Sequence, residues 1–142
     1  MKILLLFASI LTMNFATAQE AEIKKSIQTF FEGLHTADTL KIKSVSAKNM
    51  VLQTIYDGKK KKLEQLSSND FYKSIASIPP AIKVEEKLLS YNIQQDGSMA
   101  HVWTPYEFYM NGKLSHKGVN SFQLYKDEGV WKIIYIVDTR RQ

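Results

Sequence analysis

The residues best suited to chemistry lie in the last third of the chain. His116 supplies an imidazole, Asp138 a carboxylate and Asn120 an amide, while Glu107 is a second candidate carboxylate. A carboxylate beside an imidazole sets its tautomer and raises its pKa, which suits the pair to general acid–base catalysis or to polar ligand contacts. His116, Asp138 and Glu107 are therefore the catalytic candidates.

Aromatic residues and the end of an N-terminal helix complete the candidate ligand site. Trp103 and Tyr106 carry flat rings that can stack on a ring-shaped ligand. The predicted ligand contacts are Trp103, Tyr106, His116, Asn120, Asp138, Phe31 and His35. Three interpretations of this group stay open: a polar cluster that closes the sheet, a binding site without catalysis, and an acid–base enzyme.

Composition and motifs exclude several other kinds of site. The chain of 142 residues has no Cys, which excludes disulfides, thiolate zinc sites, iron–sulfur clusters and cysteine nucleophiles. Its three His residues show no metal-ligand spacing, and no serine nucleophile elbow, phosphate-binding loop or dinucleotide fingerprint is present. We expect no metal and no cofactor. The net charge is +5, but the basic run 59–62 contains no aromatic residue, so we expect no nucleic-acid partner.

Four long strands are predicted to position the candidate residues. From Ala81 onward, turn sequences at 96–97, 111–112 and 127–129 divide the chain into four extended runs, which is typical of an antiparallel meander. Strands this long twist strongly, so we expect the sheet to curl around the helices that precede it. Bulges are predicted in the first run and at Pro105.

The third run has a face that changes from polar to apolar along its length. His116 and Asn120 lie on this face beside Phe122, and Gly118 leaves a gap between the polar groups. This pattern predicts a pocket that is lined by the core and opened at one end. Pairing through the last turn places Asp138 opposite Gly118 and diagonal to His116.

Pairing through the turn at 111–112 sets the other side of the predicted pocket. It places Glu107 opposite His116 and Trp103 opposite Asn120. A bulge at the proline between them would bring the neighbouring tyrosine to this position instead.

Three helices are predicted before the meander. The first carries apolar residues at helical spacing: Ile23, Ile27, Phe30, Phe31 and Leu34. A short second helix follows a cap at 36–38, and the chain then turns extended over 50–56 before a turn at 57–58. The third helix begins at the cap-rich 67–69 and ends at Pro79-Pro80. Helices followed by strands predict one α+β domain.

The first segment has the pattern of a secretory signal peptide. Lys2 supplies the positive start, residues 3–15 form an apolar run too short to span a bilayer, and Ala16-Thr17-Ala18 matches a small-x-small cleavage site. Cleavage after Ala18 would leave a single domain of residues 19–142. We therefore expect a periplasmic or secreted protein that has no membrane association after cleavage.

The last strand predicts a second partner surface. Alternation over 130–137 places Trp131 and Ile133 on one face and Ile134 and Ile136 on the other, so both faces are apolar. A strand that is apolar on both faces needs a cover on each. We expect homodimerisation through the sheet face.

The order of the elements resembles the nuclear transport factor 2-like superfamily, whose curved sheet wraps a helix around a pocket. Residues 129–133, Gly-Val-Trp-Lys-Ile, look like the start of the last strand of that superfamily. The stretches 103–109, 115–120 and 138–141 are similar to a branch of small exported bacterial proteins, many of them described as "putative lumazine-binding". The resemblance covers essentially the whole mature chain. It implies a cone-shaped, strongly curved antiparallel sheet wrapped around N-terminal helices, a cystatin-like roll.

The resemblance implies a fold rather than an activity, because the superfamily includes isomerases, dehydratases, polyketide-cyclase-like enzymes and binders without catalysis. The tyrosine and two acids of ketosteroid isomerases are not matched residue by residue, so that chemistry is not carried over. The favoured function is an exported small-molecule-binding protein with a pocket between the first helix and the curved sheet. The alternative is a small acid–base enzyme of the isomerase or dehydratase type that uses His116 with Asp138 or Glu107.

Overall fold

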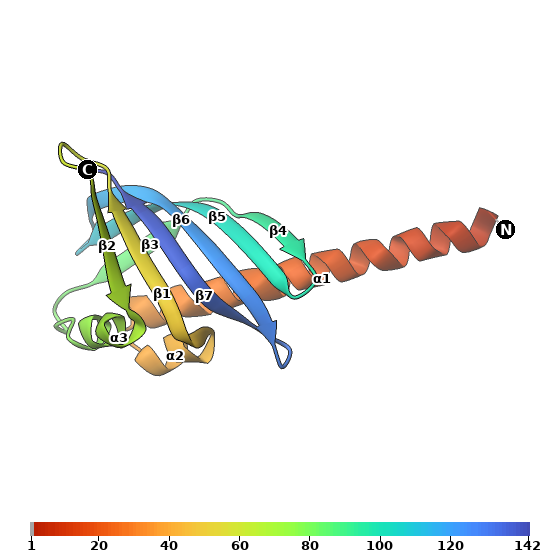
Figure 1. Ribbon diagram of the computed structural model, residues 1–142, viewed down its shortest axis with the longest axis horizontal. Coiled ribbons are helices and arrows are strands. Elements are labelled where there is room, and N and C mark those ends of the chain that lie inside the picture. Colours follow the sequence, from red (N-terminus) through yellow and green to blue (C-terminus); the bar gives the residue numbers. More distant parts are fainter. Residues whose placement is uncertain (1) are drawn as a thin grey trace.

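The computed structural model describes residues 2–142, with side chains from Ala18 onward, so the side chains of the predicted signal peptide lie outside the described residues. Residues 2–142 form three helices and seven strands (Figure 1). In chain order these are α1 (Lys2–His35), α2 (Thr39–Ser44), β1 (Ser46–Tyr56), β2 (Lys62–Ser67), α3 (Ser68–Ala76), β3 (Val84–Leu88), β4 (Asn92–Asp96), β5 (Met99–Met110), β6 (Lys113–Asp127) and β7 (Val130–Arg140). From Ala18 onward, no helix has the length and apolar character needed to cross a bilayer.

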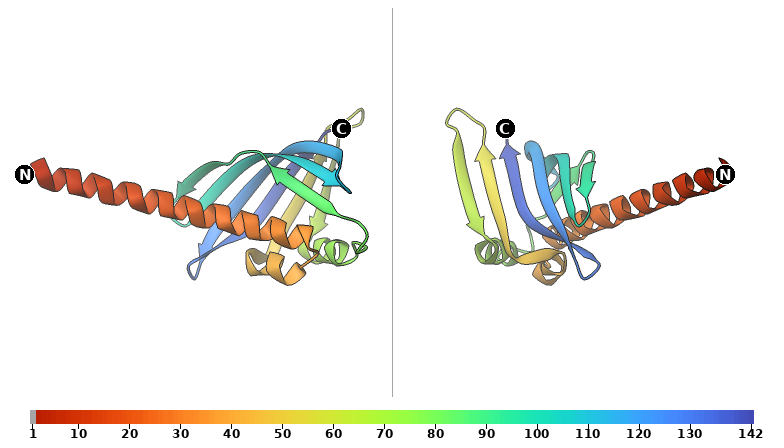
Figure 2. Two further views of the ribbon diagram at one scale, coloured as in Figure 1. Left: turned by 180° about the vertical axis from the view of Figure 1, so that it is seen from behind. Right: turned by 45° about the vertical axis from the view of Figure 1, so that its right-hand side comes forward.

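One strongly curved sheet contains all the strands of the described chain. Its order is β2-β1-β7-β6-β5-β3, and β4 also pairs with β5. β1 runs parallel to β7, and the other described pairs are antiparallel. The sheet curls around the C-terminal half of α1, with α2 and α3 gathered at one end (Figure 2). The predicted α+β class, a curved sheet wrapped around N-terminal helices, is confirmed.

The apolar face of α1 fills the concave side of the sheet. Ile23 and Ile27 are fully buried and Phe30, Phe31 and Leu34 nearly so, as their helical spacing predicts. They form one cluster with inward residues of the sheet, chiefly Val102, Phe122, Leu124, Ile133 and Ile136. Each of these large side chains contributes about 1.5–3 kcal/mol to stability by leaving water.

Side-chain caps and one glycine set the junctions of the helices. Asp38 at the start of α2 and Ser67 at the start of α3 each accept a hydrogen bond from the backbone N–H three residues later. Gly33 lets α2 approach α1 closely, because a Cβ at this position would lie 2.6 Å from Ile42 Cγ1. The cap at Asp38 and Gly33 set the position of α2 against α1, and the cap at Ser67 sets the turn from β2 into α3.

The first predicted run of the meander is two strands. β3 and β4 both pair with β5 and are separated at residues 89–91. Pro105 lies opposite this break: its carbonyl accepts the N–H of Leu89 at 2.9 Å, and it has no N–H of its own to donate on that side. The predicted bulge at Pro105 is wrong, because the register on β6 shifts between Phe108 and Tyr109 instead.

A bulge in β7 changes its predicted pairing with β6. On one side of the shift Leu124 pairs with Ile133, and on the other Gln123 pairs with Tyr135, which leaves Ile134 as an extra residue. The bulge moves the pairing by one residue, and the register at the turn, where Asp127 pairs with Val130, already differs from the prediction by one more. Asp138 lies opposite Asn120 and not, as predicted, opposite Gly118.

The same bulge corrects the predicted faces of the last strand. Trp131, Ile133 and Ile136 are all buried, whereas Ile134 is 37% exposed. The strand changes the direction of its side chains at the bulge, so residues from both predicted faces enter the core. Val130 and Ile134 remain the exposed apolar residues of this strand, and Ile136 moves into the core, so its outer face is less apolar than the sequence predicts.

Candidate functional site

A pocket of about 490 Å³ lies between α1, α3 and the concave side of the sheet, where β2, β1, β7, β6 and β3 contribute lining residues. Its apolar lining consists of Phe30, Phe31, Leu34, Leu52, Leu66, Phe71, Phe122 and Ile136. Its polar residues are Gln53, Thr54, Tyr56, Glu64, Gln65, Glu86, Asn120, Asp138 and Arg140. Aromatic rings at one part and convergent polar groups at the other are typical of a small-molecule site.

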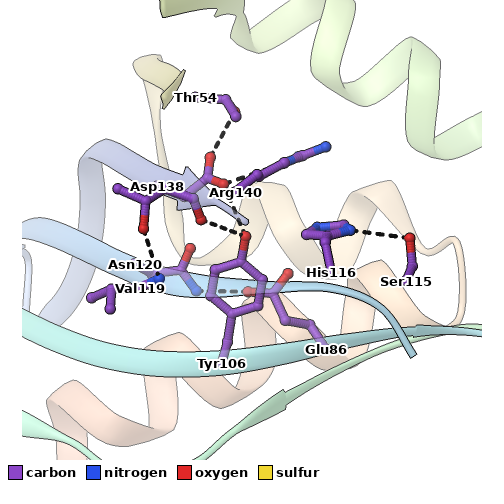
Figure 3. A network of polar contacts seen from close by, with 10 residues as sticks. Thr54, Glu86, Tyr106, Ser115, His116, Val119, Asn120, Asp138 and Arg140 are labelled. Carbon is purple, nitrogen blue, oxygen red and sulfur yellow. Dashed lines mark hydrogen bonds and ion pairs between the residues drawn. The ribbon is translucent and has the colours of Figure 1, made fainter. Parts of the chain in front are cut away.

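Asp138 joins three strands at the polar side of the pocket. Thr54 Oγ1 donates a hydrogen bond to its Oδ1 at 2.6 Å, and Arg140 Nε lies 3.3 Å from its Oδ2 (Figure 3). The hydroxyl of Tyr106 lies 3.1 Å from the same Oδ2. These partners come from β1, β7 and β5, so the carboxylate links side chains of three strands beside the pocket.

The ring of Tyr106 occupies the space beside Gly118 where the sequence predicts an opening. A Cβ at Gly118 would lie 1.7 Å from the carbonyl oxygen of Thr139 and 3.0 Å from the Tyr106 ring. The Tyr106 hydroxyl reaches that carbonyl at 2.9 Å. Burial and the carboxyl groups of Asp138 and Glu86 raise the pKa of Tyr106, so its hydroxyl stays a proton donor.

Glu86 places a second carboxyl in the pocket, with Asn120 as its partner. Asn120 Nδ2 donates to Glu86 Oε1 at 2.6 Å, and Asn120 itself is only 4% exposed. Burial, with a smaller effect from Asp138, raises the pKa of Glu86 to about 7, against the hydrogen bond from Asn120 and the charge of Arg140. Near neutral pH this carboxyl therefore exists in both protonation states, as a donor and as an acceptor.

His35 supports Glu86 from α1 and does not line the pocket. Its Nε2 accepts the backbone N–H of Glu86 at 2.8 Å, which requires a neutral ring with the proton on Nδ1. Burial lowers the pKa of His35, against the opposite effects of Glu85 and Glu32. The predicted ligand contact of His35 is thus replaced by a structural contact that fixes β3 beside the pocket.

His116 has no ion pair or hydrogen bond with a carboxylate from Ala18 onward. Its ring stacks on Phe108, with centroids 4.7 Å apart, and its Nδ1 lies 3.2 Å from the Ser115 hydroxyl. Burial and Arg140 lower the pKa of His116, against a smaller effect of Asp138, whereas the predicted carboxylate partner would have raised it. The acid–base pair of His116 with Asp138 is wrong, because the shifted register takes the aspartate to Asn120.

Two further predicted site residues lie on the convex face of the sheet. Glu107 pairs across the strands with Lys117, and its carboxylate accepts a hydrogen bond from Tyr109 at 2.8 Å. Trp103 pairs with Ser121 and is 49% exposed. The predicted pairings of Glu107 with His116 and of Trp103 with Asn120 are off by one residue, because the sequence does not reveal that Ser115 is an extra residue in β6.

Of the predicted site residues, Phe31, Asn120 and Asp138 line the pocket, and Tyr106 supports Asp138 from beneath. Sequence reasoning missed Glu86 as a pocket residue. A signal was present: alternation along 84–88 puts this glutamate between two partly buried apolar residues on one face of β3. Within the described part of the chain, no group of His, Asp and Glu is arranged to hold a metal ion.

The sequence matches a family model. The family is described as "Putative lumazine-binding", and the match covers residues 18–137, which is nearly the whole of the folded region. A comparison with curated proteins finds no match.

Three solved structures share the fold with low sequence identity. A protein of unknown function from Mycobacterium tuberculosis is 12% identical, with a TM-score of 0.74 over 92% of this chain and 76% of that chain. A nuclear transport factor 2-like (NTF2-like) protein from Cytophaga hutchinsonii is 15% identical, with a TM-score of 0.71 over 87% and 98%. A "putative dehydratase" of the same fold family from Streptomyces avermitilis is 15% identical, with a TM-score of 0.70 over 89% and 99%. Identities this low establish the fold alone.

Proposed function

Because the chain belongs to the "putative lumazine-binding" family of nuclear transport factor 2-like proteins, we propose that it binds a small, ring-containing molecule in the pocket between α1 and the curved sheet. The carrying observation is the Glu86–Asn120 pair, a carboxyl and an amide 2.6 Å apart in a pocket that combines aromatic and aliphatic side chains with polar ones. A partly buried carboxyl without a cationic partner in contact costs stability, and such groups gather at functional sites.

The pocket is tested by blocking it and comparing bound material. Native mass spectrometry of the purified protein is expected to show a retained adduct of a few hundred daltons that is lost on denaturation. Leu66→Trp fills the pocket from β2 and is expected to abolish the adduct, whereas Leu63→Trp on the same strand lies outside the pocket lining and keeps it. An adduct that survives Leu66→Trp would place the ligand elsewhere.

A proton-transfer enzyme is the second candidate, and one observation favours it. Glu86 has a pKa of about 7 and shares the pocket with Asp138, which suits it to accept or return a proton at neutral pH. Glu86 thus replaces His116 as the proposed proton-transferring group, because His116 has no carboxylate partner among the described residues. Once a ligand is known, turnover that is lost in Glu86→Gln with binding retained would establish the enzyme, and unchanged turnover would contradict it.

We also propose that the protein is exported. The signal-peptide pattern supports secretion into the periplasm or beyond, and N-terminal sequencing of protein from cell fractions is expected to begin at Gln19. Detection of intact Met1 on the mature protein would contradict this.

The convex sheet face supports a homodimer. In its cross-strand row Trp103, Ser121 and Val137 are neighbours, and Trp103 and Ile134 are exposed apolar residues on this side. Light scattering after gel filtration is expected to give twice the mass of the mature chain, and Trp103→Glu is expected to give a monomer. A monomeric native protein would contradict the dimer.

A further inference from the structure

The described lining of the pocket is acidic, although the chain as a whole is basic. It includes three carboxyl groups, from Glu64, Glu86 and Asp138, against one cation, Arg140. The whole chain has a net charge of +5. The negative charge of the pocket is therefore a local property of the site and does not follow from the composition.

Two of these carboxylates already have cationic partners. Arg140 Nε lies 3.3 Å from Asp138 Oδ2, and Lys62 forms an ion pair with Glu64. Glu86 differs from both, because the hydrogen bond that its side chain makes among the described residues comes from the neutral amide of Asn120. Its charge is therefore the one that the lining leaves without a cation in contact.

The groups that face Glu86 from neighbouring elements do not supply the missing charge. His35 from α1 accepts the backbone N–H of Glu86 and is neutral in that contact. Asp138 from β7 is itself acidic, and Arg140 from the same strand is paired with Asp138. Tyr106 from β5 keeps its proton, because burial and both carboxyls raise its pKa. Burial likewise raises the pKa of Glu86, as expected for a carboxyl that lacks a counter-charge.

Aromatic rings line the apolar part of the same pocket. The rings of Phe30 and Phe71 are stacked, with centroids 5.7 Å apart and planes 2° from parallel. The ring of Phe31 meets that of Phe122 edge-on at 6.0 Å. The faces of aromatic rings carry partial negative charge and attract cations, so these walls accept a flat ring and favour a positive group on it.

We infer that the ligand is a flat aromatic or heteroaromatic molecule with a positively charged, N–H-donating group, such as an amidinium or a protonated amine, that pairs with Glu86. This rests on the proposed function, since it concerns the occupant of the same pocket. The competing occupant is an anion held by Arg140, whose terminal nitrogens point away from Asp138 in Figure 3. Glu86 is favoured over Arg140 because its charge is unmatched, whereas Arg140 is paired with Asp138 and lies over the ring of Tyr56 at 5.7 Å.

Three probes of one shape and different charge test this inference. Benzamidinium, benzamide and benzoate are titrated at pH 8 into the purified protein, and affinities are read from shifts in ¹H–¹⁵N NMR spectra. Benzamidinium is expected to bind about tenfold more tightly than benzoate, with benzamide between them. Glu86→Gln is expected to remove most of this preference. Glu85→Gln, the same charge change on an exposed neighbour, is expected to keep it.

The possible outcomes show whether the inference alone fails or the proposed function fails with it. Tightest binding of benzoate would overturn the inference, leave the pocket in place and move recognition to Arg140. A benzamidinium preference that persists in Glu86→Gln would overturn the role of Glu86. If none of the three probes at about 10 mM shifts the NMR signals of pocket residues, the proposed function is overturned, and the inference with it.

Discussion

The side-chain amide of Asn120 on β6 donates to the carboxyl of Glu86 on β3 at 2.6 Å, although β5 runs between the two strands. The strong curvature of the sheet brings them together over its concave side. A carboxyl held in this way has lost water without gaining a cation, and burial raises its pKa to about 7. The free energy of unfolding should therefore depend on pH through the ionisation of Glu86.

Glu86→Gln is expected to stabilise the protein at high pH and to have little effect at low pH. The folded-state pKa of Glu86, about 7, lies above its ordinary value of 4.5, so the folded state holds the proton more tightly than the unfolded state. Its contribution is fully present below pH 4.5 and is lost as the pH rises through 7. Urea denaturation should find the variant more stable by about 1–3 kcal/mol at pH 8 and equal at pH 4. An equal gain in the exposed control Glu85→Gln would contradict this assignment.

His35 is expected to give the opposite slope of stability with pH. Burial lowers its pKa below 6.5, so the unfolded state binds the proton more tightly. The contribution of neutral His35 is present above pH 6.5 and is lost as the pH falls below it. Gln at position 35 keeps an acceptor for the backbone N–H of Glu86 but does not titrate. Between pH 7.5 and 5.5, the free energy of unfolding of the His35→Gln variant should therefore fall by about 0.5–1 kcal/mol less than that of the native chain. Parallel profiles for the two proteins would show that His35 does not titrate as described.

Gly118→Ala is expected to prevent folding or to cost more than about 3 kcal/mol. Its Cβ would lie 1.7 Å from the carbonyl oxygen of Thr139, which is backbone and cannot turn aside. Gly58→Ala is the control, since nothing lies within 4 Å of a Cβ there. Thermal denaturation of both variants checks the prediction, and a stable, native-like Gly118→Ala would show that β7 can move away.

Tyr106→Phe is expected to destabilise the protein by about 1–2 kcal/mol, because it removes the hydroxyl from Asp138 and from the carbonyl of Thr139 while keeping the packed ring. Tyr109→Phe is the matched control: its hydroxyl reaches Glu107 on the outer face, and its loss should leave the denaturation midpoint unchanged. Equal effects of the two changes would mean that the Tyr106 hydroxyl is not held in the way described.

The fold could be predicted because its signals are local. The spacing of Ile23, Ile27 and Phe30 defines the buried face of α1, and the cap at Ser67 marks the start of α3. The alternation of β6 places Asn120 and Phe122 inside, as the structure confirms. Such patterns depend on the chain's own periodicity and do not require knowledge of its partners.

The site was less predictable, because it depends on register. The register at the turn and the extra residue at Ile134 each move the partner of Asp138 by one position, from Gly118 to Asn120. The shift after Phe108 turns Trp103 and Glu107 outward. The position of a bulge is set by the packing of several strands. It cannot be located from the alternation of apolar and polar residues in one strand before the paired strands are known. The carboxyl of Asp138 was assigned to the pocket correctly, but its partner was not.

The place of β7 between β1 and β6 has a consequence for synthesis. Its parallel pairing with β1 joins the N-terminal hairpin to the rest of the sheet, so the two halves have no strand contact until the final segment is available. Asp138 and Arg140 lie on the same strand, and the polar side of the pocket is completed with it. A ribosome must therefore release almost the entire chain before the molecule can close, and long-range pairing of this kind folds late and slowly. A nascent chain that ends before β7 therefore has no strand pairing between the β1–β2 hairpin and the part of the sheet formed by β3, β5 and β6.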